Sequence, residues 1–184
     1  MRAESTAIPG VIALHAPVHA DARGAFVKPF AAAAFDALEL VTPLWSESFW
    51  TRSKRGVIRG MHLQHPPAAQ SKLVWCVAGV AFDVLVDLRA GSPTYGQTHV
   101  AELTARHGAA LLVPPGVAHG FQSLASETTL VYLVSEGYEP DADGGVRWDS
   151  IGVAWPERPV ALSARDAALP ALADYQSPFV FDVD

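Results

Sequence analysis

Apolar and polar residues alternate with a period of two through the middle of the chain. The stretch Lys72–Arg89 (KLVWCVAGVAFDVLVDLR) is rich in Val, Phe and Trp, and Gly79 interrupts it, which predicts two strands joined by a tight turn. In the second strand the alternation places Asp83 on the face opposite Val84 and Val86. An acid that faces inward from mid-strand is costly in a closed core, so the pattern favours a wet cavity inside the sheet.

Further short segments continue this pattern, namely THVAELT, GAALLVP, GFQSL and TLVYLV, and turn sequences such as GSPTYG and PPG separate them. Many short strands with little helix predict an all-β fold, arranged as a sandwich, a jelly roll or a small barrel. Ala31–Leu40 is the best helix candidate. The segment LSARDAALPALADY, which Pro170 divides, is expected to form a short helix or a loop.

The length of 184 residues predicts one domain, residues 1–184, with a core that needs no disulfide. The single cysteine, Cys76, lies in an apolar run and is expected to be a core residue. No apolar run approaches the roughly 20 residues that span a bilayer. The N-terminal segment does not resemble a signal peptide, so we expect a cytoplasmic protein without membrane contacts. The formal net charge of −6 argues against a general nucleic-acid binder but leaves room for a local basic pocket.

The hexapeptide RGMHLQ places His62 on a polar strand face, opposite Met61 and Leu63. A lone histidine is most often a structural residue. Lys72 and the inward-facing Asp83 change that balance, because several ionisable groups that converge on one sheet face indicate a pocket with shifted pKa values.

The stretch VPPGVAHGF contains the spacing Pro-x-Gly-x-x-His, ending at His119, which is typical of cupin jelly rolls and makes a metal-dependent cupin the first alternative. Metal cupins present His-x-His and a later Glu on one strand, and a further His on a second strand. Here Gln64 stands where the second histidine belongs, His65 falls on the opposite face, and no acid follows at the expected spacing. Two histidines are too few for a convincing site, so we expect no metal.

Tyr132 lies in the apolar strand TLVYLV. As a core aromatic, it would place its hydroxyl against a backbone partner. As a functional residue, it would donate a proton in the cavity that His62 faces. The pattern alone leaves both interpretations open.

Six segments appear in the order DARGAFVKPF, GVIRGMHLQHPPAAQSKLV, FDVLVDLRAGSPTYG, LLVPPGVAHGF, VRWDSIGVAWP and LSARD. In these segments the chain resembles the dTDP-4-dehydrorhamnose 3,5-epimerase family, which consists of cupin-like enzymes of nucleotide-sugar metabolism. Each segment alone is weakly specific, but six in family order between Ile8 and Phe181 are highly specific. The resemblance implies a cupin-like jelly roll (double-stranded β-helix) with a few short helices.

The resemblance also implies a reaction that needs no cofactor. The substrate is a hexose with a ketone at C4, linked through a diphosphate to a nucleoside. Inversion at C3 or C5 removes a proton next to the ketone, holds the enolate and returns a proton to the opposite face. By matching motifs, the family's base falls on His62 and the facing acid on Tyr132. The carboxylate that orients the imidazole falls on Asp166, and Lys72 would face the developing C4 oxyanion.

Other matched positions imply contacts with the rest of the substrate. Arg23 and Arg59 match diphosphate contacts, where planar guanidinium groups suit phosphate oxygens. His119 matches a substrate contact, and Tyr138 matches the aromatic residue that stacks on the nucleobase.

The chain departs from the family pattern mainly near the nucleotide. Asp143 and Arg165 fall at nucleotide-contact positions as conservative replacements of Glu and Lys. Lys28 stands where the family has a nucleotide-binding glutamate, and Glu47–Phe49 replaces a Gln-x-Asn stretch. Two further replacements are Leu133 and Gly137. Because misplaced donors and acceptors reject the wrong ligand, these changes bear on which nucleobase is accepted.

The main hypothesis is a cofactor-independent 3,5-epimerase that converts dTDP-4-dehydro-6-deoxyglucose to dTDP-4-dehydrorhamnose, feeding rhamnose or a related cell-surface sugar. The alternatives are a 3- or 5-monoepimerase acting on a dTDP-, GDP- or CDP-linked keto sugar, a metal-dependent cupin, and a non-catalytic sugar-nucleotide-binding protein. The family is dimeric and exchanges strands between subunits. The resemblance therefore implies a homodimer in which Arg23 serves the neighbouring site.

Overall fold

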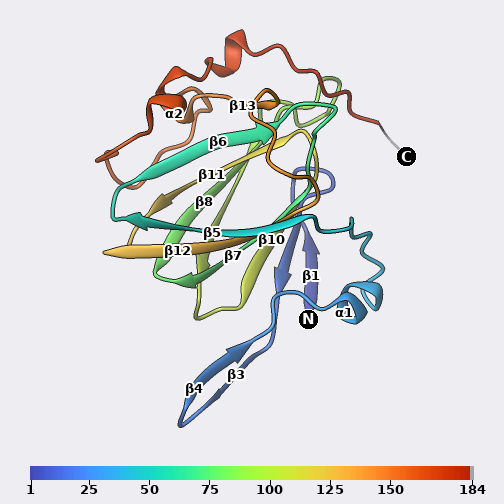
Figure 1. Ribbon diagram of the computed structural model, residues 1–184, viewed down its shortest axis with the longest axis vertical. Helices are drawn as coiled ribbons and strands as arrows, with labels where there is room; N and C mark the ends of the chain where they lie inside the picture. The colour runs from blue at the N-terminus through green and yellow to red at the C-terminus, as the bar shows by residue number, and fades with distance from the viewer. Residues whose placement is uncertain (183–184) are drawn as a thin grey trace.

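Two antiparallel sheets face each other in the computed structural model, which describes residues 1–182 (Figure 1). The strands of the six-stranded sheet, in spatial order, are β1 (Arg2–Ser5), β2 (Ile12–His15), β10 (Ala109–Val113), β7 (Lys72–Ala78), β12 (Glu127–Val134) and β5 (Glu47–Lys54). Those of the five-stranded sheet are β13 (Asp143–Gly145), β6 (Ile58–Gln64), β11 (Val117–Ser123), β8 (Val80–Asp87) and β9 (Thr98–Thr104). This arrangement confirms the all-β, cupin-like jelly roll.

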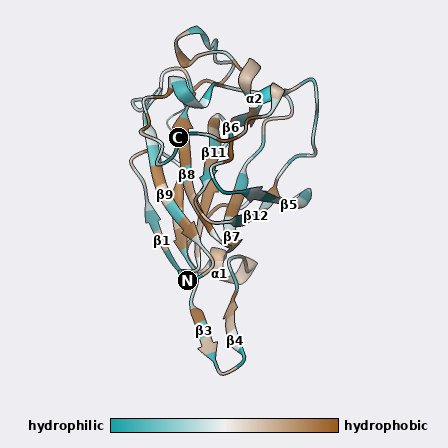
Figure 2. Cartoon of the chain, turned by 90° about the vertical axis from the view of Figure 1, so that its left-hand side faces the viewer, coloured by the Kyte–Doolittle hydropathy of each residue, from teal (hydrophilic) through white to brown (hydrophobic). Residues whose placement is uncertain are grey.

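A separate hairpin, β3 (Val18–Asp21) and β4 (Gly24–Val27), projects from the body of the molecule (Figures 1 and 2). Helical structure is sparse, as expected. The helices of the described residues are α1 (Ala32–Asp36), η1 (Trp148–Ser150), α2 (Ala164–Ala168) and η2 (Leu172–Asp174). The first lies in the segment predicted to be helical, and α2 and η2 lie on either side of Pro170. No helix within residues 1–182 combines the length and the apolar character that a membrane crossing requires.

Strand β8 is buried on both faces, which explains its almost continuous apolar sequence. Leu85 points between the two sheets and belongs to the same buried cluster as Phe121. Val84 and Val86 point the other way and pack, with Phe179, beneath the C-terminal segment. Figure 2 shows this concentration of hydrophobic residues on the central strands.

The tight turn predicted at Gly79 joins β7 to β8, and its φ of +78° is one that glycine adopts without strain. A side chain there would also collide with the backbone of Glu127, since the added carbon would lie 2.2 Å from its carbonyl oxygen. Cys76, just before this turn, is buried in the cluster between the sheets, as expected.

Asp83 faces inward, as the alternation predicts, but it is completely buried and does not line the cavity. The Oδ2 atom of Asp83 lies 2.8 Å from Nε2 of His119, whose ring does line the cavity. The cost of burying this acid is therefore offset by a hydrogen-bonded partner rather than by water.

Candidate active site

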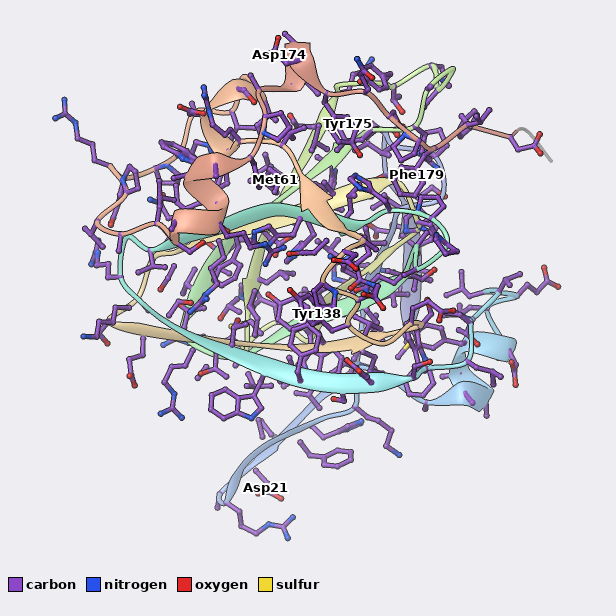
Figure 3. The ribbon with its side chains drawn as sticks, turned by 45° about the horizontal axis from the view of Figure 1, so that its top comes forward. Asp21, Met61, Tyr138, Asp174, Tyr175 and Phe179 are labelled. Carbon is purple, nitrogen blue, oxygen red and sulfur yellow. The ribbon has the colours of Figure 1, made fainter. Side chains whose placement is uncertain are left out.

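The space between the two sheets contains a cavity of about 410 Å³, which is within the usual range for a small-molecule site. Strands β5, β6, β7, β11 and β12 line it, and residues of β13 and α2 close one side. Figure 3 shows Tyr138 close to the ribbon of β5, where its amide donates to Glu47, whereas Asp21 lies at the distant tip of the β3–β4 hairpin. The cavity therefore draws on segments that are far apart in the sequence.

His62 reaches the cavity because β6 alternates as predicted, with Met61 and Leu63 buried on the opposite face. Its Nε2 atom lies 2.8 Å from Oδ1 of Asp166, a buried residue of α2 that is 104 positions away in the sequence. A carboxylate beside Nε2 holds a proton on that nitrogen, which leaves the lone pair on Nδ1. Burial lowers the pKa of His62 below its ordinary value although Asp166 opposes this shift, so the ring is neutral at neutral pH.

Three donors fix the carboxylate of Asp166. Besides His62, the hydroxyl of Ser163 donates to Oδ1 at 2.7 Å, and the amide of Gly60 donates to Oδ2 at 3.2 Å. Ser163 is also the N-cap of α2, where its hydroxyl accepts from the amide of Asp166. Burial alone would raise the pKa of Asp166, but the contacts with His62, Ser163 and Gly60 outweigh it and lower that pKa. Asp166 therefore stays ionised.

Strands β6 and β11 approach each other closely at Gly60, the residue whose amide donates to Asp166. A Cβ at Gly60 would lie 2.5 Å from the Cα of Gly120, and one at Gly120 would lie 2.6 Å from the sulfur of Met61. Gly60 also has a φ of +135°, which side-chain-bearing residues rarely adopt. Both positions require glycine, and the strands consequently meet directly beside the His62–Asp166 pair.

Lys72 enters the cavity from β7, and its Nζ donates a hydrogen bond to the carbonyl oxygen of His62 at 3.0 Å. Removal from water and the nearby charge of Arg165 lower the pKa of Lys72 to about 8. The ammonium group thus lies beside His62 and is poised to lose its charge in mildly alkaline solution.

Tyr132 lines the cavity from β12 and is 5% exposed. Its ring stacks on Phe49, with centroids 4.7 Å apart, and meets the ring of His119 edge-on at 5.7 Å. Burial raises the pKa of the Tyr132 phenol, so it stays protonated at neutral pH. Tyr132 therefore belongs to the core cluster and also lines the cavity that His62 faces, and its role as a proton donor stays a prediction.

Six further residues predicted to contact substrate also line the cavity. They are Glu47, Arg59, His119, Tyr138, Asp143 and Arg165. Arg165 of α2 forms an ion pair with Asp143 of β13 across one side of the cavity. Tyr138 is 61% exposed, which places it where the cavity meets solvent.

Arg23 and Lys28 are not in this cavity. Arg23 lies at the turn of the projecting hairpin, where its side chain is 90% exposed and pairs with Asp21 at 2.5 Å. Lys28 follows the same hairpin, and its Nζ lies 5.8 Å from the ring centre of Phe26. Because the hairpin extends away from the body, neither residue reaches the cavity of its own chain, and their contact with substrate stays a prediction that requires the neighbouring subunit.

Three polar residues that line the cavity lie outside the predicted set of site residues: Thr51, Gln64 and Gln70. The alternation of RGMHLQ already placed Gln64 on the face of His62, and this signal was sufficient to find it. The family resemblance places Phe49 with Glu47 near the nucleotide end, whereas in the structure the Phe49 ring stacks on Tyr132. Its role depends on the pairing of β5 with β12, which no local pattern reveals.

Within residues 1–182, no group of three or more His, Cys, Asp or Glu side chains is arranged to hold a metal ion. His62 and His119 each direct Nε2 to a carboxylate oxygen at 2.8 Å. These nitrogens are therefore already engaged in hydrogen bonds.

The chain is similar to known sugar-nucleotide epimerases over most of its length. The family model for dTDP-4-dehydrorhamnose 3,5-epimerase matches residues 5–174. The dTDP-4-dehydrorhamnose 3,5-epimerase of Salmonella typhimurium is 38% identical over 170 residues, which are 91% of this chain and 93% of that protein.

Two solved structures show the same architecture. The dTDP-6-deoxy-D-glucose-3,5-epimerase from Legionella pneumophila, in complex with dTDP-4-keto-L-rhamnose, has a TM-score of 0.89 at 31% identity, covering 95% of this chain and 94% of that chain. A 3'-monoepimerase from Streptomyces bikiniensis, in complex with dTDP-quinovose, has a TM-score of 0.85 at 35% identity, covering 91% and 86%. The chain therefore shares both its fold and about a third of its residues with these two epimerases.

Proposed function

The chain belongs to the dTDP-4-dehydrorhamnose 3,5-epimerase family, and from this premise we propose that it converts dTDP-4-dehydro-6-deoxyglucose to dTDP-4-dehydrorhamnose. It is an isomerase that acts on a nucleotide-linked keto sugar. The observation that carries the proposal is the His62–Asp166 pair in a cavity that Lys72 and Tyr132 also line.

The first step in this mechanism is proton abstraction by His62. Asp166 holds a proton on Nε2, so Nδ1 of His62 takes the proton from the carbon next to the C4 ketone. The low pKa of His62 keeps the free base available at neutral pH. Asp166 stabilises the imidazolium that forms, because a negative charge beside Nε2 favours the protonated ring. A positioned base of this kind contributes about 10²- to 10⁴-fold to the rate.

The second requirement is a positive group near the C4 oxygen, where negative charge develops. Lys72 lines the cavity beside His62, and its Nζ donates a hydrogen bond to the carbonyl oxygen of His62. Preorganised donors of this kind are worth roughly 3–4 kcal/mol in the transition state. We assign this role to Lys72.

The third requirement is an acid on the opposite face of the sugar. Tyr132 lines the same cavity from the other sheet, and its raised pKa keeps the proton on the phenol. After Tyr132 gives that proton to the enolate carbon, the configuration at the carbon is inverted. Repetition at the second carbon adjacent to the ketone completes a 3,5-epimerisation.

The nucleotide end of the site is proposed to extend from Arg59 and Arg165 to the exposed ring of Tyr138. Guanidinium groups suit diphosphate oxygens, and an exposed aromatic ring suits a nucleobase. The projecting hairpin that carries Arg23 and Lys28 favours a homodimer in which these residues complete the partner's site. Light scattering tests this, and a monomer at working concentration would remove both residues from the site.

A second candidate is a monoepimerase that inverts only one centre. The similarity to the Streptomyces bikiniensis 3'-monoepimerase favours keeping it, since the two chains are 35% identical. The same groups serve both reactions, and the number of centres inverted depends on how the sugar turns within the cavity.

The test incubates the protein in deuterated water with the dTDP-, GDP- and CDP-linked 4-keto-6-deoxy sugars. NMR then measures deuterium incorporation and inversion at C3 and C5. The proposal expects deuterium at C3 and C5 of the dTDP substrate together with inversion at both centres. Deuterium at one carbon alone would indicate the monoepimerase. If wild type and His62→Ala exchange equally slowly with all three substrates, the protein is not an epimerase of this kind.

The same samples address the remaining alternatives. Binding without exchange would identify a sugar-nucleotide-binding protein. Elemental analysis that found stoichiometric iron, manganese or nickel, lost on substitution of His62 or His119, would instead favour a metal-dependent cupin.

A further inference from the structure

Phe49 and Tyr132 are direct partners in the register of β5 and β12. Their ring centroids lie 4.7 Å apart and their planes differ by only 12°, so the two rings lie face to face. Both side chains line the cavity. One face of the Tyr132 ring is therefore covered by Phe49.

His119 limits the Tyr132 ring from another direction. The two centroids are 5.7 Å apart and the planes meet at 74°, which is an edge-to-face contact. His119 is itself held by Asp83, through a 2.8 Å hydrogen bond. The plane of the phenol is thus set by one rigidly held imidazole and by one stacked aromatic ring.

Phe49 contributes little to the packing of the hydrophobic core. It is 43% exposed, and β5 is the last strand of its sheet in the part of the chain that the structure describes. An exposed aromatic ring at a sheet edge adds little to a hydrophobic core. Its most extensive aromatic contact is the stack on Tyr132.

We propose that Phe49 is a positioning residue that fixes the plane of Tyr132, so that the phenol delivers its proton to the sugar face opposite His62. This inference rests on the proposed epimerase function and adds a residue to it. It also gives a reason for an aromatic ring at position 49, where the family resemblance leads one to expect asparagine.

The two halves of the reaction make the role of Phe49 separable from that of His62. In the first half, the carbon–hydrogen bond breaks, its proton goes to Nδ1 of His62, and its electron pair moves through the enolate to the C4 oxygen. In the second, the O–H bond of Tyr132 breaks, the proton bonds to carbon, and the electron pair from oxygen re-forms the ketone. The resulting phenolate then takes a proton from water and the imidazolium of His62 releases its proton to solvent, which returns both groups to their starting states.

A misaligned phenol impairs only the second half. His62 still removes the proton, exchanges it with solvent and returns a solvent proton to the original face. The product of that route is exchanged but not inverted. The ratio of inversion to exchange therefore reports on the alignment of Tyr132, whereas a general loss of stability changes both rates together.

The experiment compares wild type, Phe49→Asn, Phe49→Leu and Phe49→Tyr in deuterated water with saturating dTDP-4-keto-6-deoxyglucose. Inversion and deuterium incorporation at C3 and C5 are measured by NMR, and folding is checked by circular dichroism and thermal unfolding. Since a displacement near 1 Å costs up to about 10²-fold, Phe49→Asn and Phe49→Leu should lower the ratio of inversion to exchange by roughly tenfold or more. Phe49→Tyr retains a stacked ring and should restore the wild-type ratio.

The outcomes separate this inference from the function on which it rests. If wild type inverts its substrate and the ratio is unchanged in Phe49→Asn and Phe49→Leu, Phe49 does not position Tyr132. If Phe49→Asn fails to fold, the ratio in Phe49→Leu decides, because leucine retains the apolar bulk without a flat ring. A wild-type protein that neither exchanges nor inverts overturns the proposed function, and this inference with it.

Discussion

His62 and His119 lie directly opposite each other in the register of β6 and β11, and each directs Nε2 to a carboxylate oxygen 2.8 Å away. The two pairs differ in the surroundings of their carboxylates. Asp166 accepts two further hydrogen bonds, from Ser163 and Gly60, whereas within the described residues Oδ1 of Asp83 has no hydrogen-bond partner. Hydrogen bonds lower the pKa of Asp166 and fix its carboxylate beside His62, whereas burial raises the pKa of Asp83, which supports His62 as the base.

Replacing Asp166 by Asn should lower kcat/KM by roughly 10²- to 10⁴-fold, because the amide neither holds the required tautomer nor stabilises the imidazolium. The charge of Asp166 raises the pKa of His62 against the effect of burial. Removing that charge lowers the pKa of His62 further. The acid limb of the residual kcat/KM should therefore lie at lower pH than in wild type. A pH profile of kcat/KM measures the shift. An acid limb that moves upward, or a rate close to wild type, would contradict the role given to Asp166.

The alkaline limb of activity should report on Lys72. The ammonium group must be charged to face the C4 oxygen, and its pKa is lowered to about 8. Activity should therefore fall as the pH rises through about 8, far below the ordinary pKa of lysine. Lys72→Met should lower kcat, and the pH profile of its residual activity should lack this alkaline limb.

Arg165 offers a matched control for this limb. Its positive charge contributes to the lowered pKa of Lys72, so Arg165→Ala should move the alkaline limb to higher pH while weakening nucleotide binding. An alkaline limb that is the same in wild type and in Arg165→Ala would show that another group controls it.

The close contact of β6 and β11 predicts a large effect of Gly60→Ala on stability. The added carbon would meet the Cα of Gly120 at 2.5 Å, and a φ of +135° strains any residue other than glycine. We expect a loss of about 2–5 kcal/mol in the free energy of unfolding, measured by urea denaturation. Gly24→Ala is the control, since its φ is +125° but nothing lies within 4 Å. Equal losses in the two variants would show that backbone strain alone explains the effect.

Ser163→Ala tests how the cap of α2 supports the site. The variant loses the N-cap and one donor to Asp166, so the free energy of unfolding should fall by about 1 kcal/mol. With fewer hydrogen bonds, the carboxylate interacts more strongly with a protonated His62, and the acid limb of kcat/KM should move to higher pH. Ser163→Thr retains a hydroxyl and should restore both properties. If Ser163→Ala loses stability while the acid limb stays in place, Ser163 serves the helix but not the carboxylate.

Sequence patterns predict the strands and the turn at Gly79, because both follow from properties of short segments of the chain. The alternation in β8 and β6 follows from one face of each strand pointing between the sheets, and the turn at Gly79 follows from a φ that glycine adopts freely. The same alternation in β6 correctly predicts that His62 faces the cavity. Position within a strand is a local property, and two-residue periodicity reports it directly.

The contacts that these residues make join segments that are distant in the sequence, and no local pattern predicts them. Matching motifs named Asp166 as the partner of His62, but only the packing of α2 against β6 brings the two atoms to 2.8 Å. The assignment of Phe49 to the nucleotide end, and of Arg23 to a substrate contact in the neighbouring subunit, follows from matched family motifs. Strand pairing places Phe49 on Tyr132, and the extended hairpin carries Arg23 away from the cavity of its own chain.

The sequence by itself therefore determined the strands, their inward faces and the chemical groups available for proton transfer. Tertiary structure alone decided which groups meet, since contacts such as Gly60 with Gly120 and Asp83 with His119 join strands that are distant in sequence. The physical reason is that an isolated strand sets only the direction of a side chain, whereas distance and burial depend on what packs opposite it. Those two quantities set the pKa values on which the proposed chemistry depends.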